Sequence, residues 1–434
     1  MKKTAAQPLT STVTDESFSR PGARAWLVWT LSCLFYFYEF LLQVSPSVMG
    51  THLMREFSVT ANGLGILSGV YFLSYSGMQI PAGILLDRLG PHRLLTLASI
   101  ICAVSTLIFG MTDHFAMALV ARFLIGFGSA FAFVGALKLV ANWFPARRFA
   151  LLTGLIVTIG MLGAIGGEAP LAHFIHQVGW RQSMYSLGVA GLILSLIIFL
   201  VVKDTPMGRS IPKNTKASLV AREFWEILKS KQLWLVAIYG GLIYMPTPTL
   251  CGLWGVPFLE AQYQISATAA AAMISLVLLG WAVGSPIWGG VSDKMARRLP
   301  AMLVAAVGAP LTLLIILYYP LTNILALQVL LFSFGFFSCA FLPAFSITRE
   351  INKPEHCATA LSFMNMMNMV GVSLAQPLLG KALDALWDGK MDQGVRIYSL
   401  ANYRMSLTIM LAIMTIALLL IPFIKDTYAK PLDS

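Results

Sequence analysis

Charged side chains are scarce in this chain. Only 11% of its 434 residues are Asp, Glu, Lys or Arg, whereas 57% are hydrophobic, and the mean hydropathy is +0.76. A soluble domain carries about 25% charged residues, so this composition excludes an ordinary soluble fold. Acidic residues are the scarcer kind, with 19 against 30 basic ones and a net charge of +11. The composition is that of a basic membrane protein.

Patterns that support catalysis or metal binding are missing as well. The chain has no glycine-rich phosphate loop ending in Lys-Ser or Lys-Thr, no clustered His and Cys ligands, and no paired carboxylates in a soluble segment. Four of its five cysteines, Cys33, Cys102, Cys251 and Cys339, fall within apolar segments, so no disulfide framework is indicated. We therefore expect neither an enzyme nor an ATP-driven pump, and no metal or cofactor.

Long apolar runs are what the chain has instead. A helix needs about 20 predominantly apolar residues to cross the core of a bilayer, and twelve segments meet this length. The segments are residues 25–48, 61–85, 94–111, 115–141, 149–172, 181–202, 232–257, 267–290, 300–319, 321–348, 357–381 and 405–424. The sequence thus predicts an all-α membrane protein with twelve transmembrane helices.

Basic residues are distributed unevenly among the connections between these segments. If the first helix leaves the cytoplasm, most Lys and Arg residues fall in the tails and the even-numbered connections, and few face the other side. The outward-facing ones are Arg55, Arg181, Lys381, Lys390, Arg396 and Arg404. Because positive residues stay on the cytoplasmic side, both termini are predicted to be cytoplasmic. The bases are scattered over short loops, which argues against binding of nucleic acid.

One loop sequence occurs twice. Residues 83–93 read Gly-Ile-Leu-Leu-Asp-Arg-Leu-Gly-Pro-His-Arg, and residues 289–298 again place glycine, aspartate and bases between apolar segments. Asp293 lies 206 residues after Asp87. This duplication predicts two pseudo-symmetric six-helix bundles, and the repeated loops mark equivalent cytoplasmic corners of the two.

The predicted boundaries follow from composition. Residues 1–22 are expected to be a disordered cytoplasmic tail, 23–203 and 232–426 the two bundles, 204–231 a cytoplasmic linker, and 427–434 a second cytoplasmic tail. The linker should contain a short helix at the membrane interface, because its apolar residues fall on one face. These residues are Val220, Phe224, Ile227 and Leu228.

The repeated loop predicts a conformational latch. An aspartate at a helix end can pair with neighbouring bases, here Arg88 or Arg93, and accept hydrogen bonds from helix N-termini of the other bundle. Such a contact holds in one conformation and opens in the other. An ordinary stop-transfer corner is the alternative. The predicted latch residues are Gly83, Asp87, Arg88, Gly90 and Arg93 in the first copy and Asp293, Lys294 and Arg297 in the second.

Charges inside the predicted spans are informative, because each costs about 2.5–3.5 kcal/mol to insert. The first half contains four of them, Glu39, Arg122, Lys138 and Glu168. Lys138 is expected to reach the cytoplasmic interface along its flexible stem, with an anion contact in the cavity as the alternative. Glu168 either takes part in proton coupling or neutralises Arg122 or Arg181.

Glu39 lies near the middle of the first span on a polar stripe. Tyr36, Glu39, Gln43 and Ser47 follow one another at helical spacing, so they share one face. Such a face turns toward a water-filled cavity or a partner helix and not toward lipid. We interpret Glu39 as a proton-binding or substrate-contacting carboxylate, and a structural salt bridge is the alternative.

The second half offers neutral polar groups instead. Asn365, Asn368 and Gln376 fall on one stripe of the eleventh span, where they either hydrogen-bond a substrate or join helices to one another. This contrast suggests titration in the first bundle and hydrogen bonding of substrate in the second. Tyr244 and Trp254 are predicted gate or stacking residues beside a break in the seventh span. The break is predicted from Pro246, Pro248, Gly252, Gly255 and Pro257.

Three motifs carry a resemblance to a known family. Residues 83–93 resemble the Gly-x-x-x-Asp-Arg-x-Gly loop motif of the major facilitator superfamily, although Pro91 and His92 stand where bases are usual. Residues 122–128 resemble its Arg-x-x-x-Gly-x-Gly motif in helix 4, and residues 143–148 resemble the corner that follows. The likeness extends over essentially the whole predicted membrane region. It points to a proteobacterial branch distantly similar to lysosomal dipeptide carriers and phagosomal amino-acid transporters.

The resemblance implies a fold and a set of site residues. In this superfamily helices 1 and 4 line a central cavity, and the motif arginine of helix 4 is associated with an acid in helix 1. The resemblance therefore implies that Arg122 acts with Glu39. Glu168 is the third residue that we predict to take part in proton coupling. The predicted substrate contacts are Tyr36, Gln43, Arg122, Tyr244, Trp254, Asn365, Asn368 and Gln376.

The predicted function is secondary transport by alternating access. An arginine and acids in one cavity suit an amino acid, a short peptide or an organic anion, and protons are the expected coupling ion. Drug-efflux members of the superfamily show Gly-Pro within helix 5, which residues 160–170 lack, so uptake is favoured over efflux. A sensor that keeps the fold without transport is a further alternative. The short external loops carry no Asn-x-Ser/Thr site, which favours a bacterial inner membrane, and we expect a monomer in the lipid bilayer.

Overall fold

The computed structural model of the chain describes residues 22–145, 148–206, 224–319, 321–353 and 356–428. Within these ranges the fold is helical apart from one hairpin of β1 (Met391–Asp392) and β2 (Val395–Arg396). Eleven helical stretches in the described part are long and apolar enough to cross a membrane, and a bent pair, Gly50–Glu56 with Ala61–Leu89, makes up to twelve. The predicted all-α membrane fold is confirmed.

The helices of the two halves follow one another along the chain with few interruptions. The first half comprises α1 (Ala23–Val44), η2 (Ser45–Val48), α2 (Gly50–Glu56), α3 (Ala61–Leu89), α4 (Pro91–Met111), α5 (Phe115–Trp143), α6 (Phe149–Gly166), α7 (Ala169–Val178) and α8 (Trp180–Val201). The second half comprises α10 (Lys231–Tyr244), α11 (Pro246–Thr249), η4 (Leu250–Trp254), α12 (Gly255–Tyr263), α13 (Ala267–Met295), α14 (Leu299–Tyr318), α15 (Ile324–Ser338), η5 (Cys339–Phe341), α16 (Pro343–Glu350), α17 (Cys357–Ala385), α18 (Leu400–Leu420) and η7 (Ile421–Phe423).

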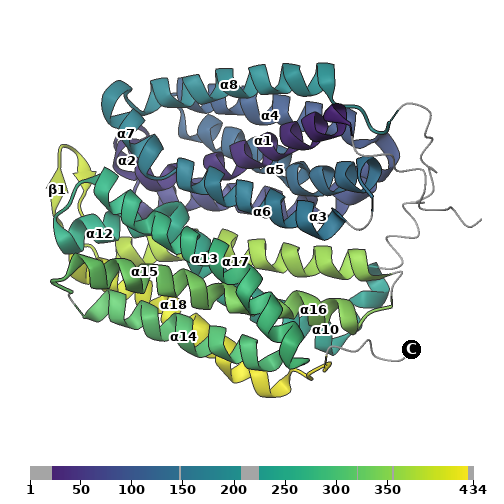
Figure 1. Cartoon of the computed structure of the whole chain (residues 1–434). Helices are drawn as coiled ribbons and strands as arrows, with labels where there is room; N and C mark the ends of the chain where they lie inside the picture. Colours follow the sequence, from purple (N-terminus) through teal and green to yellow (C-terminus); the bar gives the residue numbers. More distant parts are fainter. Residues whose placement is uncertain (1–21, 146–147, 207–223, 320, 354–355, 429–434) are drawn as a thin grey trace, which may run out of the picture.

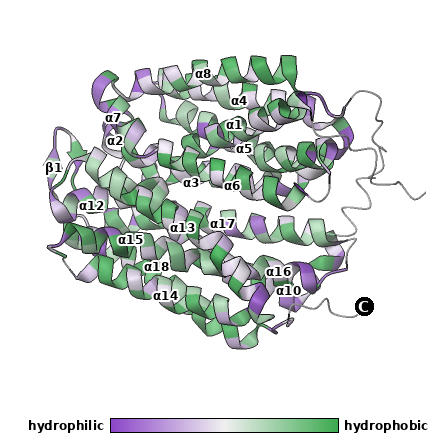
Figure 2. Ribbon diagram, viewed as in Figure 1, coloured by the Kyte–Doolittle hydropathy of each residue, from purple (hydrophilic) through white to green (hydrophobic). Residues whose placement is uncertain are grey.

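The two halves lie side by side, with the first half above the second in Figure 1. The hairpin, α2, α7 and α12 gather at one end, here named the hairpin end. The opposite end holds the last turns of α3 and α13 and is named the corner end, since both repeated loops lie there. Hydrophilic residues concentrate at the two ends, and hydrophobic ones cover the helices between them (Figure 2). This distribution matches a protein that spans a bilayer.

Two of the long helical stretches are interrupted, and both interruptions involve residues that disfavour regular helix. The seventh span breaks after Tyr244 at Pro246 and continues as a π-helix, Leu250–Trp254, before α12. Short π-helices inside α-helices occur frequently at functional sites. In the fifth span α6 ends at Gly166 and α7 begins at Ala169, which leaves Glu168 in the break between them.

Helices α3 and α17 form the closest contact between the halves. A Cβ atom on Gly65 would lie 2.4 Å from the backbone oxygen of Gln376, and one on Gly380 would lie 2.3 Å from that of Ala61. Only glycine permits such an approach of two helix backbones. The two helices are therefore in backbone contact near the hairpin end.

A hydrogen-bonded cluster also joins the two halves at the hairpin end, along the contact of α3 with α17 that is named the seam. The Asp384 carboxylate of α17 accepts a 2.9 Å hydrogen bond from the backbone N–H of Asn62, and the Tyr398 hydroxyl accepts one of 3.1 Å from that of Ala61. Tyr398 in turn donates to Asp384 at 2.5 Å, and Arg396 pairs with Asp384 at 3.3 Å. Burial raises the pKa of Tyr398 and keeps its hydroxyl protonated for this donation. The second half thus caps the N-terminus of α3.

The linker helix is described only in part. Residues 224–227 are helical, and Ile227 is buried in a cluster with Leu233, Ala360 and Phe363. Its apolar face therefore packs on α10 and α17. Three parts of the predicted tails and linker lie outside the described residues: 1–21, 207–223, which include Val220, and 429–434.

Candidate functional site

A cavity of about 970 Å³ lies between the two halves. Its wall includes Leu151 and Leu155 from the first turns of α6 and Ala358 and Leu361 from the first turns of α17, and Leu151 is 65% exposed. These turns lie next to the loops of the corner end, so the cavity opens toward that end. A concave site of this size suits a small organic ligand.

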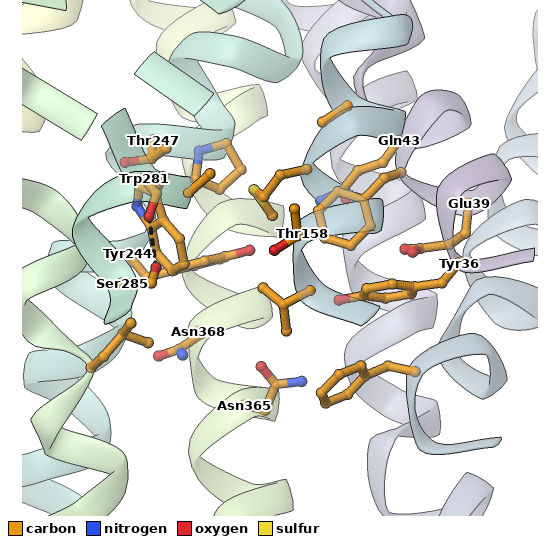
Figure 3. Close-up of a pocket in the computed structure, with 18 of the residues that line it drawn as sticks. Tyr36, Glu39, Gln43, Thr158, Tyr244, Thr247, Trp281, Ser285, Asn365 and Asn368 are labelled. Carbon is orange, nitrogen blue, oxygen red and sulfur yellow. Dashed lines mark hydrogen bonds between the residues drawn. The ribbon is translucent and has the colours of Figure 1, made fainter. Parts of the chain in front are cut away.

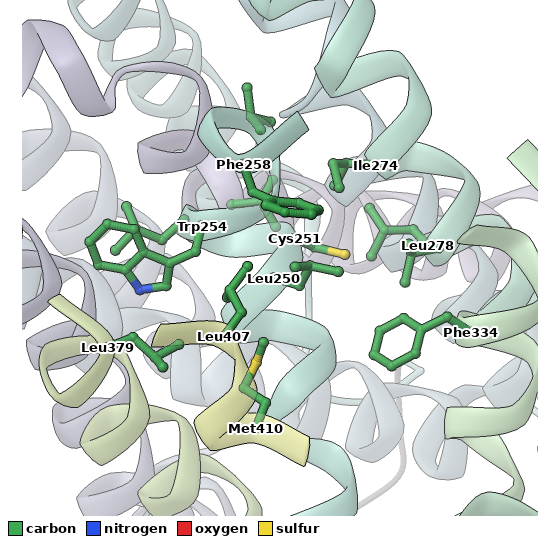
Figure 4. Packing of buried hydrophobic residues seen from close by; sticks show 14 of the residues in the cluster. Leu250, Cys251, Trp254, Phe258, Ile274, Leu278, Phe334, Leu379, Leu407 and Met410 are labelled. Carbon is green, nitrogen blue, oxygen red and sulfur yellow. The ribbon is translucent and has the colours of Figure 1, made fainter. Parts of the chain in front are cut away.

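The hairpin end of the cavity is closed by apolar packing. Helices η2 and η4 meet there, and Trp254 belongs to a buried cluster with Leu250, Phe258 and Leu379 (Figure 4). Trp254 is 2% exposed and does not line the cavity. The π-helix turns the indole into the packed contact between the halves, so the substrate contact of Trp254 stays a prediction that this arrangement does not display. Tyr244, on the other side of the break, does line the cavity (Figure 3).

Glu39 lies in the cavity wall, as its stripe predicts. The side chain is 1% exposed, and its Oε1 accepts a 2.7 Å hydrogen bond from the Tyr71 hydroxyl. The other oxygen, Oε2, has no hydrogen-bond partner among the described residues. Tyr36 and Gln43, about one turn to either side, line the cavity with it (Figure 3). An unpaired carboxylate oxygen at this position is free to bind a proton or a hydrogen-bond donor.

Arg122 does not line the cavity and does not contact Glu39 directly. Its Nη1 donates a 2.9 Å hydrogen bond to the backbone oxygen of Leu42, and its guanidinium lies 4.9 Å from the centre of the Tyr71 ring. No ion pair joins it to Glu39 in the described part of the chain. In this arrangement Tyr71 links the two groups, since its hydroxyl binds Glu39 and its ring lies against the guanidinium. The pairing of Arg122 with Glu39 and its substrate contact stay predictions.

Glu168 lies away from the cavity, in the break between α6 and α7. It is fully buried, Ser47 donates to its Oε2 at 3.1 Å, and its Oε1 has no hydrogen-bond partner in the described residues. Ser47 thus leaves the stripe of Glu39 and binds the second acid. Arg181, a predicted partner, instead pairs with Glu56 at 2.6 Å and Asp113 at 2.5 Å. Glu168 therefore does not neutralise Arg181 in this structure, because Arg181 lies at the start of α8 and pairs with other acids.

The amide stripe of α17 is divided between cavity and seam. Asn365 and Asn368 line the cavity (Figure 3), and the Asn365 Nδ2 donates a 2.9 Å hydrogen bond to the Gln79 Oε1 of α3. Gln376, two turns further, is fully buried and donates to the Pro248 carbonyl at 3.4 Å. This contact with the broken seventh span is of the kind that the alternative interpretation, an amide that joins helices, expects, and the substrate contact of Gln376 stays a prediction.

Several polar residues of the wall were not predicted. They are Tyr75, Gln79, Thr158, Thr247, Trp281, Ser285 and Ser362. Tyr71, Tyr75 and Gln79 follow a spacing of four, which is a helical signal of the same kind as the stripe of Glu39. Trp281 and Ser285 are also four residues apart, and Ser362 precedes Asn365 by three, whereas Thr158 and Thr247 belong to no such stripe.

The predicted latch residues pair within their own halves. Asp87 accepts a 2.5 Å contact from Lys138 of α5 and not from Arg88 or Arg93, so the predicted partners are corrected. α3 and α5 pack side by side, and the long lysine stem reaches the last turns of α3. Lys138 therefore pairs with an acid, where snorkelling was predicted.

The second corner is more elaborate than the first. Asp293 pairs with Arg298 at 2.6 Å, and Arg298 also pairs with Glu350 at 2.7 Å. Arg297 pairs with Asp426 at 3.5 Å. Among the described residues no ion pair is recorded for Arg88, Arg93 or Lys294, and none crosses between the halves at the corner end. Gly90 has φ +81° and ends α3, so its role is to turn the chain.

Comparison with known proteins defines the class of this fold and cavity. The sequence profile of the Major Facilitator Superfamily matches residues 28–255 and 250–433. The chain belongs to this superfamily, whose members are membrane carriers and not enzymes.

Individual relatives are distant. A probable sulfoacetate transporter of Cupriavidus necator is 24% identical over 283 residues, which cover 61% of this chain and 64% of that protein. The chain therefore matches less than two thirds of that relative's length. A lysosomal dipeptide transporter of Danio rerio is 24% identical over 383 residues, covering 82% and 80%. A bacterial homolog of the human lysosomal transporter Spinster, solved inward-facing and unoccupied, has a TM-score of 0.78 at 19% identity, with 94% and 98% of the chains covered. At that identity the likeness concerns the fold alone.

Proposed function

We propose that the protein is a secondary transporter that moves a small organic solute across the membrane by alternating access, coupled to protons through Glu39. The single observation that supports this proposal is the position of Glu39, an acid in the wall of a central cavity with one carboxylate oxygen unpaired. An ionised carboxylate at such a place is costly unless paired, so its protonation can differ between conformations.

The surroundings of Glu39 suggest how protonation is coupled to movement. Tyr71 donates to its Oε1, and the same ring packs under the Arg122 guanidinium, which binds the Leu42 carbonyl near the end of α1. A proton on Glu39 weakens the charge-assisted hydrogen bond from Tyr71. This change alters the contacts of α3 with α1 and α5 inside the first half. Because α3 also packs against α17 of the second half, the change reaches the surface along which one half rocks against the other.

We further propose uptake into a bacterial cytoplasm, with the corner end and both termini on the cytoplasmic side and with the monomer as the working unit. The absence of Gly-Pro from residues 160–170 supports uptake over drug efflux. The cavity opening at the corner end then corresponds to an inward-open state. The solute classes named for relatives, a sulfonate and dipeptides, set the range of substrates to test.

Transport in proteoliposomes tests the proposal. A solute that stabilises the purified protein in a thermal-shift screen is supplied with and without an inward proton gradient. We expect the wild type to accumulate it and Glu39→Gln to lose accumulation but keep counterflow exchange. Glu260→Gln, which makes the same chemical change outside the cavity, is the matched control and should behave as wild type. Normal accumulation by Glu39→Gln would transfer the role to Glu168, and proton-driven export would favour the antiporter.

A further inference from the structure

The charge of the cavity wall is limited to one residue. Among the described residues that line it, Glu39 alone carries a side chain that is charged at neutral pH, and the others are apolar, aromatic or neutral polar. The wall therefore has a charge of minus one when Glu39 is ionised and zero when it is protonated. In neither state is the wall positive.

The nearest intramembrane bases lie outside the lining, so they make no direct contact with a solute in the cavity. Arg122 is 1% exposed and held by the Leu42 carbonyl and the Tyr71 ring, outside the lining. Lys138 is paired with Asp87 at the corner end, also outside the lining. An anionic group that entered the cavity would lose water without gaining a counter-charge, which is unfavourable in an apolar site.

The rest of the wall suits an apolar body with uncharged polar groups. Aromatic rings surround the space, and the faces of such rings carry partial negative charge that repels anions. These rings belong to Tyr36, Tyr75, Phe133, Tyr244, Trp281 and Phe341. Hydrogen-bonding atoms without a partner in the described residues remain on Gln79, Thr247, Trp281 and Asn368, so the wall can bind polar groups by neutral hydrogen bonds.

We propose that the substrate is a solute without net negative charge, uncharged or zwitterionic and with an apolar or aromatic portion, and that organic anions are excluded. This proposal rests on the proposed transport function and narrows its substrate class. It separates the chain from its sulfoacetate relative, because sulfoacetate carries both a sulfonate and a carboxylate. A zwitterion such as an apolar amino acid or short peptide remains compatible, since its amine offsets its carboxylate.

The field inside the cavity is measured directly by cysteine labelling. Thr158→Cys places a thiol on the exposed face of α6 in the cavity (Figure 3). The background is Cys251→Ser with Cys357→Ser, because Cys251 also lines the cavity and Cys357 is partly exposed, whereas the three remaining cysteines are buried outside the lining. Trimethylammonioethyl, sulfonatoethyl and uncharged ethyl methanethiosulfonates are compared, each rate divided by its rate with free mercaptoethanol. At a pH at which Glu39 is ionised, we expect the cationic reagent to react on the order of tenfold faster than the anionic one. Protonation of Glu39 at lower pH, or Glu39→Gln, should bring the ratio toward one without reversing it. Faster reaction of the anionic reagent in any of these states, or equal rates in the state with Glu39 ionised, would overturn the proposal.

Ligand stabilisation provides the second arm. Leucine, leucyl-leucine and uridine are compared with sulfoacetate and galactonate in thermal unfolding of the wild type. A rise in Tm with either anion would overturn the proposal, and the absence of such a rise supports it. Neither the labelling nor the thermal unfolding uses a proton gradient. The proposed coupling through Glu39 and the proposed exclusion of anions can therefore fail independently. If Glu39→Gln still accumulates solute, the coupling role fails while the labelling result stands.

Discussion

The two halves of the molecule differ in the charge that they bury. The first half buries Glu39, Arg122 and Glu168 in its helices, all at 1% exposure or less, whereas the second half buries the amides Asn368 and Gln376 on its polar stripe. Gln376 lies 208 residues after Glu168, close to the repeat distance of the corners. Both halves therefore have buried polar positions within the membrane, but acids occupy these positions in the first half and amides in the second.

The largest expected effect concerns the two corners. There the second half, and not the first, holds the buried charges. Arg298 and Glu350 are 5% and 4% exposed, while Lys138 and Asp87 are 31% and 39% exposed. Breaking a buried pair costs about 3–5 kcal/mol, and Asp293 remains as a partner, so we expect Glu350→Gln to cost about 2 kcal/mol. Asp87→Asn should cost less than about 1 kcal/mol. Thermal unfolding in detergent gives both values, and equal losses would contradict the comparison.

The next effect tests the difference between acid and amide directly. Gln376→Glu would place a second acid at a fully buried position, where an ionised carboxylate lacks a counter-charge. We expect it to destabilise the protein by about 1–3 kcal/mol at pH 8 and by less at pH 5, where the new acid is protonated. Glu168→Gln should be neutral or stabilising at pH 8. Unfolding temperatures of both variants at the two pH values check this, and a Gln376→Glu variant as stable as wild type at pH 8 would show that the seam tolerates charge.

Arg122 provides a prediction about transport. Arg122→Lys keeps the charge but loses the planar group that stacks on Tyr71 and reaches the Leu42 carbonyl. We expect the transport rate per molecule of protein to fall by about tenfold, equivalent to about 1.4 kcal/mol in the barrier. Lys138→Arg is the matched control, since it also exchanges one base for the other in α5. An unchanged rate in Arg122→Lys would remove the linkage through Tyr71 from the mechanism.

The smallest effect is expected at the hairpin end. Asp384→Asn keeps one oxygen to accept from the Asn62 N–H but loses the charge that strengthens this bond and the pair with Arg396. We expect a shift of about 1 kcal/mol toward the conformation open at the hairpin end. Labelling of a cysteine at Gln43, below the seam, by a reagent added from that side reports the shift. Slower labelling than in the unaltered cysteine variant would contradict it.

Much of this architecture could be predicted from the sequence, for reasons that are local. Apolar length predicted the spans, Pro246 and its neighbours predicted the break of the seventh span, and the spacing of Tyr36, Glu39 and Gln43 predicted the face toward the cavity. The remainder depended on which helices are neighbours. The ring of Tyr71 between Glu39 and Arg122 could not be seen from either residue's own helix.

Other residues carried no pattern at all. Thr158 is a single polar group among the cavity-lining residues of α6, so nothing in the sequence distinguishes its cavity position from a lipid-facing one. Its place near the break predicts that Trp254 faces the cavity, and only the π-helix decides that it turns into the contact between the halves. The sequence offers Asp87 the bases next to it, whereas the packing of α3 on α5 brings Lys138 to it.

The cap on α3 has a consequence for how this protein can change over time. Asp384 and Tyr398 bind the main-chain N–H groups of Asn62 and Ala61, and every amino acid except proline supplies that group. The side chain of the partly exposed Asn62 can therefore change without loss of the contact, whereas Ala61 is fully buried and must stay small. The contact that closes the hairpin end therefore constrains the two halves unequally. The second half must keep the side chains of Asp384 and Tyr398, whereas the first half contributes only main-chain N–H groups.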